Sequence, residues 1–166
     1  MGKQILLLKN NFYHIYNCGY DKNSIFPQER NDEYFLTLWN KYISRVAETF
    51  AYCLMDNHFH SVIRMNSEFE SDKYWQPFSN FFNAYAKSVN KAIGRKGYFF
   101  QKSFKRKLIQ SNEYLLTVIR YVHQNPQKHK FTENFQTYPY SSYHSPSDNL
   151  IQLFGSEEEY KRFHSK

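Results

Sequence analysis

The sequence is poor in cysteine and has no long apolar run. Its 166 residues include two cysteines, Cys18 and Cys53, and their separation matches neither a metal motif nor a disulfide framework. No apolar run approaches the length of a membrane span, and charge comes too early at the N-terminus for a signal peptide. We therefore expect a cytoplasmic protein that does not contact membranes.

Acidic residues are outnumbered by basic ones. Lys and Arg total 22 against 15 Asp and Glu, which gives a net charge of +7, and 20% of the residues are aromatic. A basic protein favours a polyanionic partner, nucleic acid first. Single-stranded nucleic acid binds aromatic side chains set among cations, because the bases stack and the phosphates are neutralised. An aromatic-rich core would give the same composition, so composition alone does not decide the function.

Acidic residues are absent from one segment, 91–107. Aromatic side chains, among them Tyr98 and Phe104, are interspersed with its basic residues. A run of charge is usually a solvated face, but this interleaving predicts a nucleic-acid contact surface. The expected contacts are Arg95, Lys96, Lys102, Lys105, Arg106 and Lys107.

Hydrophobic periodicity predicts alternating strands and helices. The expected strands cover residues 10–19, 49–55, 58–65 and 104–110, and the expected helices cover 28–47, 76–93, 111–124 and 157–163. The buried stripe of the first helix is expected to consist of Tyr34, Phe35, Leu38, Tyr42 and Val46. Gly94 should close the second helix. The Asn125-Pro126 step should end the third, since the residue before proline disfavours the α region.

This order of elements predicts an α+β fold. The succession βαββαβ is the ferredoxin-like arrangement, an antiparallel four-stranded sheet with two helices on one face. The helix at 111–124 is added to it. We expect residues 1–166 to form one domain, with a core at about 10–126 and a polar, aromatic tail at 127–166.

Two histidines open the third expected strand. Because side chains two apart on a strand point to the same face, His58 and His60 project together while Phe59 turns to the other side. Two imidazoles on one face can occupy two positions of a divalent metal. Two polar core residues with satisfied hydrogen bonds would give the same pattern.

The helix at 111–124 supplies a candidate nucleophile. Tyr121 and Asn125 are four residues apart, so they share a helical face. If that face lies over the two histidines, the phenol can attack a phosphodiester that a metal polarises. Asn125 can add an oxygen ligand suited to Mg²⁺ or Mn²⁺. Spacing alone does not favour Tyr121 over Tyr114.

Five stretches, in this order and spacing, resemble one protein family. They are residues 13–19, 51–60, 99–102, 121–126 and 138–143. On them the chain is identified as similar to the REP-associated tyrosine transposases, a branch of the single-tyrosine HUH transposases. The resemblance implies that His58 and His60 are metal ligands, that Asn125 is a third and that Tyr121 is the nucleophile. It also implies cleavage and rejoining of single-stranded DNA at hairpins through a 5′-phosphotyrosine, with Mg²⁺ or Mn²⁺ as cofactor.

One departure from the family lies beside the histidines. Asp56 stands where the family usually has proline, and we expect its carboxylate to shape the turn rather than bind metal. Two other functions fit the residues. A non-catalytic module could bind hairpin DNA or RNA, or an unrelated metal hydrolase could use His58 and His60 with a bound water. The residues do not decide between a homodimer and a monomer.

Overall fold

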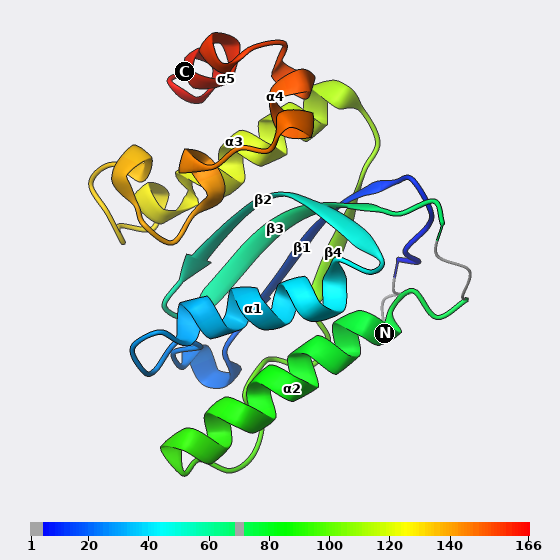
Figure 1. The fold of residues 1–166 in the computed structure, drawn as a ribbon. Coiled ribbons are helices and arrows are strands. Elements are labelled where there is room, and N and C mark those ends of the chain that lie inside the picture. Colours follow the sequence, from blue (N-terminus) through cyan, green and yellow to red (C-terminus); the bar gives the residue numbers. More distant parts are fainter. Residues whose placement is uncertain (1–4, 69–71) are drawn as a thin grey trace.

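The fold is a four-stranded antiparallel sheet between two layers of helices. The computed structural model describes residues 5–68 and 72–166. The strand order is β2-β3-β1-β4, with bounds β1 Phe12–Cys18, β2 Ala47–Met55, β3 His58–Met65 and β4 Lys105–Ile109. One face carries α1 (Asn31–Ile43) and α2 (Gln76–Ile93), and the other carries α3 (Asn112–Lys128), α4 (Asp148–Phe154) and α5 (Glu157–His164) (Figure 1). This arrangement confirms the predicted α+β, ferredoxin-like class.

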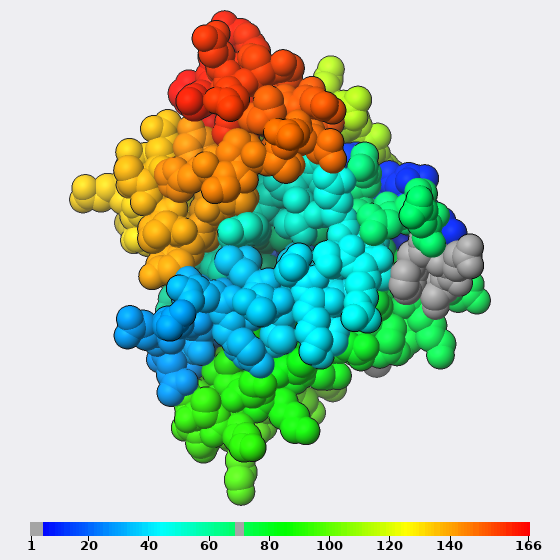
Figure 2. Space-filling model, in the orientation of Figure 1, coloured from blue at the N-terminus to red at the C-terminus, as the bar shows by residue number. Residues whose placement is uncertain are grey.

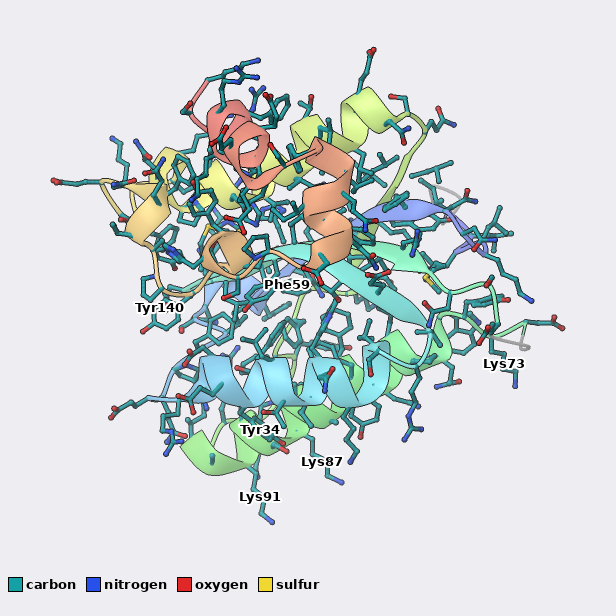
Figure 3. The ribbon with its side chains drawn as sticks, turned by 45° about the horizontal axis from the view of Figure 1, so that its top comes forward. Tyr34, Phe59, Lys73, Lys87, Lys91 and Tyr140 are labelled. Atoms are coloured by element: carbon teal, nitrogen blue, oxygen red, sulfur yellow. The ribbon has the colours of Figure 1, made fainter. Side chains whose placement is uncertain are left out.

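Aromatic side chains fill the space between the sheet and the first two helices. Phe59 turns to this side from β3 and lies between the sheet and α1 (Figure 3), where its ring contacts Phe35 and Trp39 at centroid distances of 5.0 and 5.8 Å. The predicted bounds of α2 are confirmed, and Gly94 closes the helix in the left-handed conformation with φ 67°. Among the described residues, no helix is both long enough and apolar enough to cross a membrane.

The first helix is shorter than its periodicity predicts. It ends at Ile43, and Ala47 already belongs to β2, so the prediction of helix through 47 is wrong. The reason is that Ile43 and Val46 are both buried but lie on either side of a turn, in which the Val46 N–H donates to the Ile43 carbonyl at 2.9 Å. An apolar spacing of three therefore fits a turn as well as a helix. The buried stripe is Phe35, Leu38, Trp39 and Ile43, and Tyr34 is 36% exposed.

The third helix is longer than predicted. Ser111 caps its start by accepting from the Tyr114 N–H at 3.1 Å. The expected end at Asn125-Pro126 is wrong, because the helix continues through Pro126 to Lys128. Proline removes a single backbone donor. Backbone hydrogen bonding continues beyond the proline, since the His129 N–H donates to the Asn125 carbonyl at 2.9 Å.

The segment after α3 covers the free edge of β2. It comprises two short 3-10 turns, Phe135–Thr137 and Ser142–His144, followed by α4 and α5. Figure 2 shows these residues, yellow to red, as a continuous layer above the cyan strand β2. The Leu54 N–H of β2 donates to the Tyr140 carbonyl at 2.8 Å, so part of the edge is paired. Leu150 and Tyr160 are buried in the core under this layer.

A buried polar network joins that segment to α3. His123 lies in α3, and its two ring nitrogens are 2.8 Å from His164 Nε2 and 2.9 Å from Ser142 Oγ. Ser142 Oγ in turn accepts from the Tyr52 N–H at 2.8 Å. Gln124 donates to the His164 carbonyl at 2.7 Å. The outer side of α3 is therefore fastened to residues that come later in the chain.

This network makes stability depend on pH. Burial lowers the pKa of His123 well below its usual value and that of His164 to about 4. Below an unfolded pKa of about 6.5 the unfolded chain binds protons that the folded one does not, so stability falls as the pH drops towards about 4. Each imidazole contributes up to about 1.4 kcal/mol per pH unit. Urea midpoints at pH 7.5 and 5 should show this loss, with a smaller loss in His164→Gln. A midpoint that holds or rises at pH 5 would contradict it.

Candidate active site

Four predicted side chains meet on the face of the sheet that α3 covers. His58 and His60 project together from β3, with ring centroids 5.4 Å apart. The Tyr121 ring meets His60 edge to face at 5.7 Å. Asn125, one turn further along α3, is fully buried and interacts with His58. Tyr114 lies on the same helix but is 48% exposed. The fold therefore separates two tyrosines that spacing alone did not.

His14 is a site residue that the sequence analysis missed. It lies on β1, which pairs with β3, and its Nε2 is 2.8 Å from His60 Nδ1. Its ring also meets the edge of Tyr121 at a centroid distance of 6.0 Å. The sequence could have identified His14. It lies in the predicted strand 10–19, side chains alternate between the two faces of a strand, and the ferredoxin-like fold pairs this strand with the one that carries His58 and His60.

The three histidines are held in the neutral form. Burial lowers the pKa of His14 to about 4, with a further contribution from Lys107. Burial, followed by the neighbouring His14 and His58, lowers the pKa of His60 to about 2. The pKa of His58 is also lowered, first by burial and then by His129. Neutral imidazoles can donate a lone pair to a metal, whereas protonated ones cannot.

The hydrogen bonds of the site leave ligand atoms available. His58 Nδ1 is 2.7 Å from Asn57 Oδ1, and His60 Nδ1 is occupied by His14, so each imidazole keeps its Nε2. The side-chain oxygen and nitrogen of Asn125 are buried and make no hydrogen bond of ordinary length and angle within the described part of the chain, although the amide is near enough to His58 to act against the lowering of the pKa of that imidazole. No cluster of three or more His, Cys, Asp or Glu suited to a metal occurs in residues 5–68 and 72–166. The residues therefore fit a divalent ion as two imidazoles and one amide oxygen.

The unexpected end of α3 adds two residues to the site. Lys128, the last residue of α3, and His129, which follows it, lie about two turns beyond Tyr121. The Lys128 ammonium is 5.3 Å from the centre of the Tyr121 ring, and the His129 ring is 5.2 Å from His58. Sequence reasoning missed both because it ended the helix at Asn125. Lys128 thus brings positive charge beside Tyr121, and His129 brings a further imidazole beside His58.

The predicted nucleic-acid contacts divide between two faces of the sheet. In β4, Lys105 and Lys107 pair with Tyr16 and His14 and therefore point to the site face. Arg106 pairs with Ile15 and points to the face covered by α2. The other three contacts, Arg95, Lys96 and Lys102, lie in the connection between α2 and β4. No single flat surface contains all six.

Asp56 lies in the turn between β2 and β3. Its carboxylate accepts from the Ser24 hydroxyl at 2.7 Å, and its backbone carbonyl accepts from the Ile25 N–H at 2.7 Å. These bonds connect the turn to the loop before α1. The structure thus gives Asp56 the turn-shaping position that was expected.

Comparison with known proteins assigns a family. Residues 8–125 match the family described as IS200-like transposases. A REP-associated tyrosine transposase bound to a REP hairpin has a similar structure, with a TM-score of 0.70 and 16% identity, covering 93% of this chain and 88% of that one. A protein from Deinococcus radiodurans R1, described as a transposase, gives a TM-score of 0.47 at 13% identity, covering 81% and 98%. No curated protein sequence matches significantly. The family match spans most of the chain, and the chain therefore belongs to the IS200-like transposase family.

Proposed function

We propose that this chain is a REP-associated tyrosine transposase that cleaves and rejoins single-stranded DNA at hairpin elements. The observation that carries the proposal is the position of Tyr121, whose ring lies within 6.0 Å of the rings of His14 and His60 in a chain of this family. The solved transposase with the same fold is bound to a REP hairpin. That likeness supports a DNA hairpin as the partner.

The proposed reaction is a transesterification at phosphorus. The Tyr121 oxygen forms a bond to the phosphorus, and the bond from phosphorus to the 3′ oxygen breaks. The phenolic proton is lost, and the departing 3′ oxygen gains a proton, so no net proton is consumed. The product is a 5′-phosphotyrosine and a free 3′-hydroxyl. Attack by a 3′-hydroxyl reverses the steps and rejoins a strand without another energy source.

His58 Nε2, His60 Nε2 and Asn125 Oδ1 are the atoms that would hold Mg²⁺ or Mn²⁺. When bound there, the ion would act as a Lewis acid on the phosphodiester. The protein supplies the remaining contributions. Burial keeps the imidazoles neutral, and the rigid strand β3 fixes their directions. Lys107, whose ammonium is 5.7 Å from the centre of the Tyr16 ring on the site face, would supply positive charge to a DNA phosphate.

The proposal is tested by looking for the covalent product. Labelled single-stranded hairpins from the DNA flanking the gene would be incubated with the protein and Mn²⁺, Mg²⁺ or chelator, and resolved on a denaturing gel. We expect a slowly migrating protein–DNA adduct that requires the metal. Tight, salt-dependent binding without adduct or cleavage would favour the non-catalytic binding module instead. Cleavage without adduct would favour a metal-bound water as the nucleophile.

His14 should act as a positioning residue for His60. In His14→Phe the 2.8 Å bond to His60 Nδ1 is lost, so His60 is free to rotate or to change tautomer. We expect Mn²⁺ affinity, measured by calorimetry without DNA, to fall about 10- to 100-fold. His14→Gln can still offer an acceptor and should recover part of the affinity. Equal affinities in all three proteins would contradict this role.

A further inference from the structure

A third imidazole lies beside the two histidines of β3. His129 directly follows the last residue of α3, and the centroid of its ring is 5.2 Å from that of His58. The rings of His58 and His60, which project together from one strand, are 5.4 Å apart. His129 is therefore as close to His58 as His60 is. Burial lowers the pKa of both His58 and His60, and neighbouring imidazoles that include His129 add to the effect.

The backbone holds His129 next to the third proposed ligand. Its N–H donates to the Asn125 carbonyl at 2.9 Å, which closes one helical turn. Asn125 is fully buried and interacts with His58. The Cα atom of His129 is therefore fixed beside the site, whichever way its side chain turns.

The ring of His129 is free to turn, unlike those of the other two histidines. His58 Nδ1 lies 2.7 Å from Asn57 Oδ1, and His60 Nδ1 lies 2.8 Å from His14 Nε2. His129 is exposed, and its ring nitrogens make no hydrogen bond within the part of the chain that the structure describes. In its present position the ring completes no cluster of three metal ligands among the described residues. It joins an ion only by turning, as exposed side chains do within nanoseconds.

A third imidazole changes the ions that the site prefers. Imidazole suits the later ions of the first transition row, and affinity for such ligands rises from Mn²⁺ through Co²⁺ to Ni²⁺. Mg²⁺ instead takes oxygen ligands and retains several of its waters. A turn of His129 towards the ion therefore strengthens the binding of Co²⁺ or Ni²⁺ and adds little to that of Mg²⁺. The same side chain thus discriminates between the two kinds of ion.

We propose that His129 is a metal-selecting ligand of the candidate active site, which joins His58 and His60 on Co²⁺ or Ni²⁺ and takes no part in binding Mg²⁺. The proposal rests on the proposed function, since it concerns the ion that would act on the phosphodiester. It extends that function by adding a fourth protein ligand to the two histidines and Asn125. It also assigns the site a preference for later transition ions over Mg²⁺.

The test measures metal binding without DNA. Co²⁺ would be titrated into the protein and followed by calorimetry and by visible absorption, which changes with the number of nitrogen ligands. The affinity for Mg²⁺ would be obtained from its competition with Co²⁺. Wild type would be compared with His129→Ala, which keeps the backbone N–H that bonds to Asn125. His144→Ala is the matched control, because His144 is an exposed histidine of the turn Ser142–His144, outside the candidate active site, and reports Co²⁺ held by surface imidazoles.

We expect His129→Ala to bind Co²⁺ at least about 10-fold more weakly than wild type, since even an outer-shell partner of a metal ligand contributes that much. Its Co²⁺ spectrum should differ from that of wild type, whereas its affinity for Mg²⁺ should be unchanged. His144→Ala should match wild type in all three measurements. The His129 side chain is exposed, so its loss should leave the fold intact, and a melting curve in chelator checks this.

Three results would overturn the proposal while leaving the proposed function intact. The first is a His129→Ala variant with the Co²⁺ affinity and spectrum of wild type. The second is an equal loss of Co²⁺ and Mg²⁺ affinity in that variant, which would make His129 a residue that shapes the site without selecting its ion. The third is an equal loss in His144→Ala. If His58→Ala left the binding of both ions unchanged, the metal site of the proposed function and this proposal would fail together.

Discussion

Tyr121→Phe should form at least about 1,000-fold less covalent DNA adduct than wild type, because the nucleophilic oxygen is removed. The ring that packs against His14 and His60 is retained, so the fold and the affinity for the hairpin should persist. Adduct formation would be measured on denaturing gels in Mn²⁺, and binding by anisotropy in chelator. Loss of the adduct with binding intact would assign the nucleophile.

Tyr114→Phe is the matched control for that experiment. Tyr114 lies in the same helix, and the substitution removes the same atom from a side chain that is 48% exposed. We expect this variant to form the adduct at the wild-type rate. An adduct that survives in Tyr121→Phe, or one that disappears in Tyr114→Phe, would mean that the wrong tyrosine has been assigned.

Asn125→Leu should make the protein more stable and less active. The two polar atoms of the Asn125 side chain are buried without a hydrogen-bond partner in the described structure, and Leu has nearly the same shape. Removing an unsatisfied buried polar group should add about 1–2 kcal/mol to the free energy of unfolding, or about 2–8 °C to the melting temperature of a chain of this size. Metal-dependent adduct formation should fall at least about 100-fold, because a ligand oxygen is lost.

This combination separates a metal ligand from a structural asparagine. Melting would be followed in chelator, so that metal binding does not contribute, and the adduct would be measured in Mn²⁺. Gln124→Met is the control, since this neighbouring amide makes a 2.7 Å bond to the His164 carbonyl and its loss should lower the melting temperature. If Asn125→Leu were destabilised like Gln124→Met, the asparagine would be holding the fold rather than a ligand.

The features predicted well are those that local geometry determines. The period of a strand places His58 and His60 on one face, and this holds in whatever sheet the strand lies. The bounds of α2 followed from its apolar spacing and Gly94. The alternation that separates Arg106 from Lys105 and Lys107 was also available once residues 104–110 were expected to form a strand. The composition of the basic segment 91–107 predicts one contact surface, whereas the strand divides Arg106 from Lys105 and Lys107.

The features that were missed depend on contacts between distant segments. His14 joins the site only because β1 pairs with β3, and Tyr121 differs from Tyr114 only in what lies opposite it on the sheet. Lys128 and His129 are missed because the Asn125-Pro126 step predicts the end of a helix that continues to Lys128. In the structure, burial of Asn125 and Pro126 against the sheet outweighs the local preference of the residue before proline.

The bonds that attach the outer side of α3 to later residues affect the order in which the protein can fold during translation. Every residue of the candidate active site has left the ribosome's catalytic centre once His129 is made. Ser142 and His164, which fasten the helix through His123, are made afterwards. A nascent chain therefore carries a complete set of reactive groups on a helix that is not yet fixed. We expect α3 to be fixed on this side only when the segment behind it has been translated and has folded onto it.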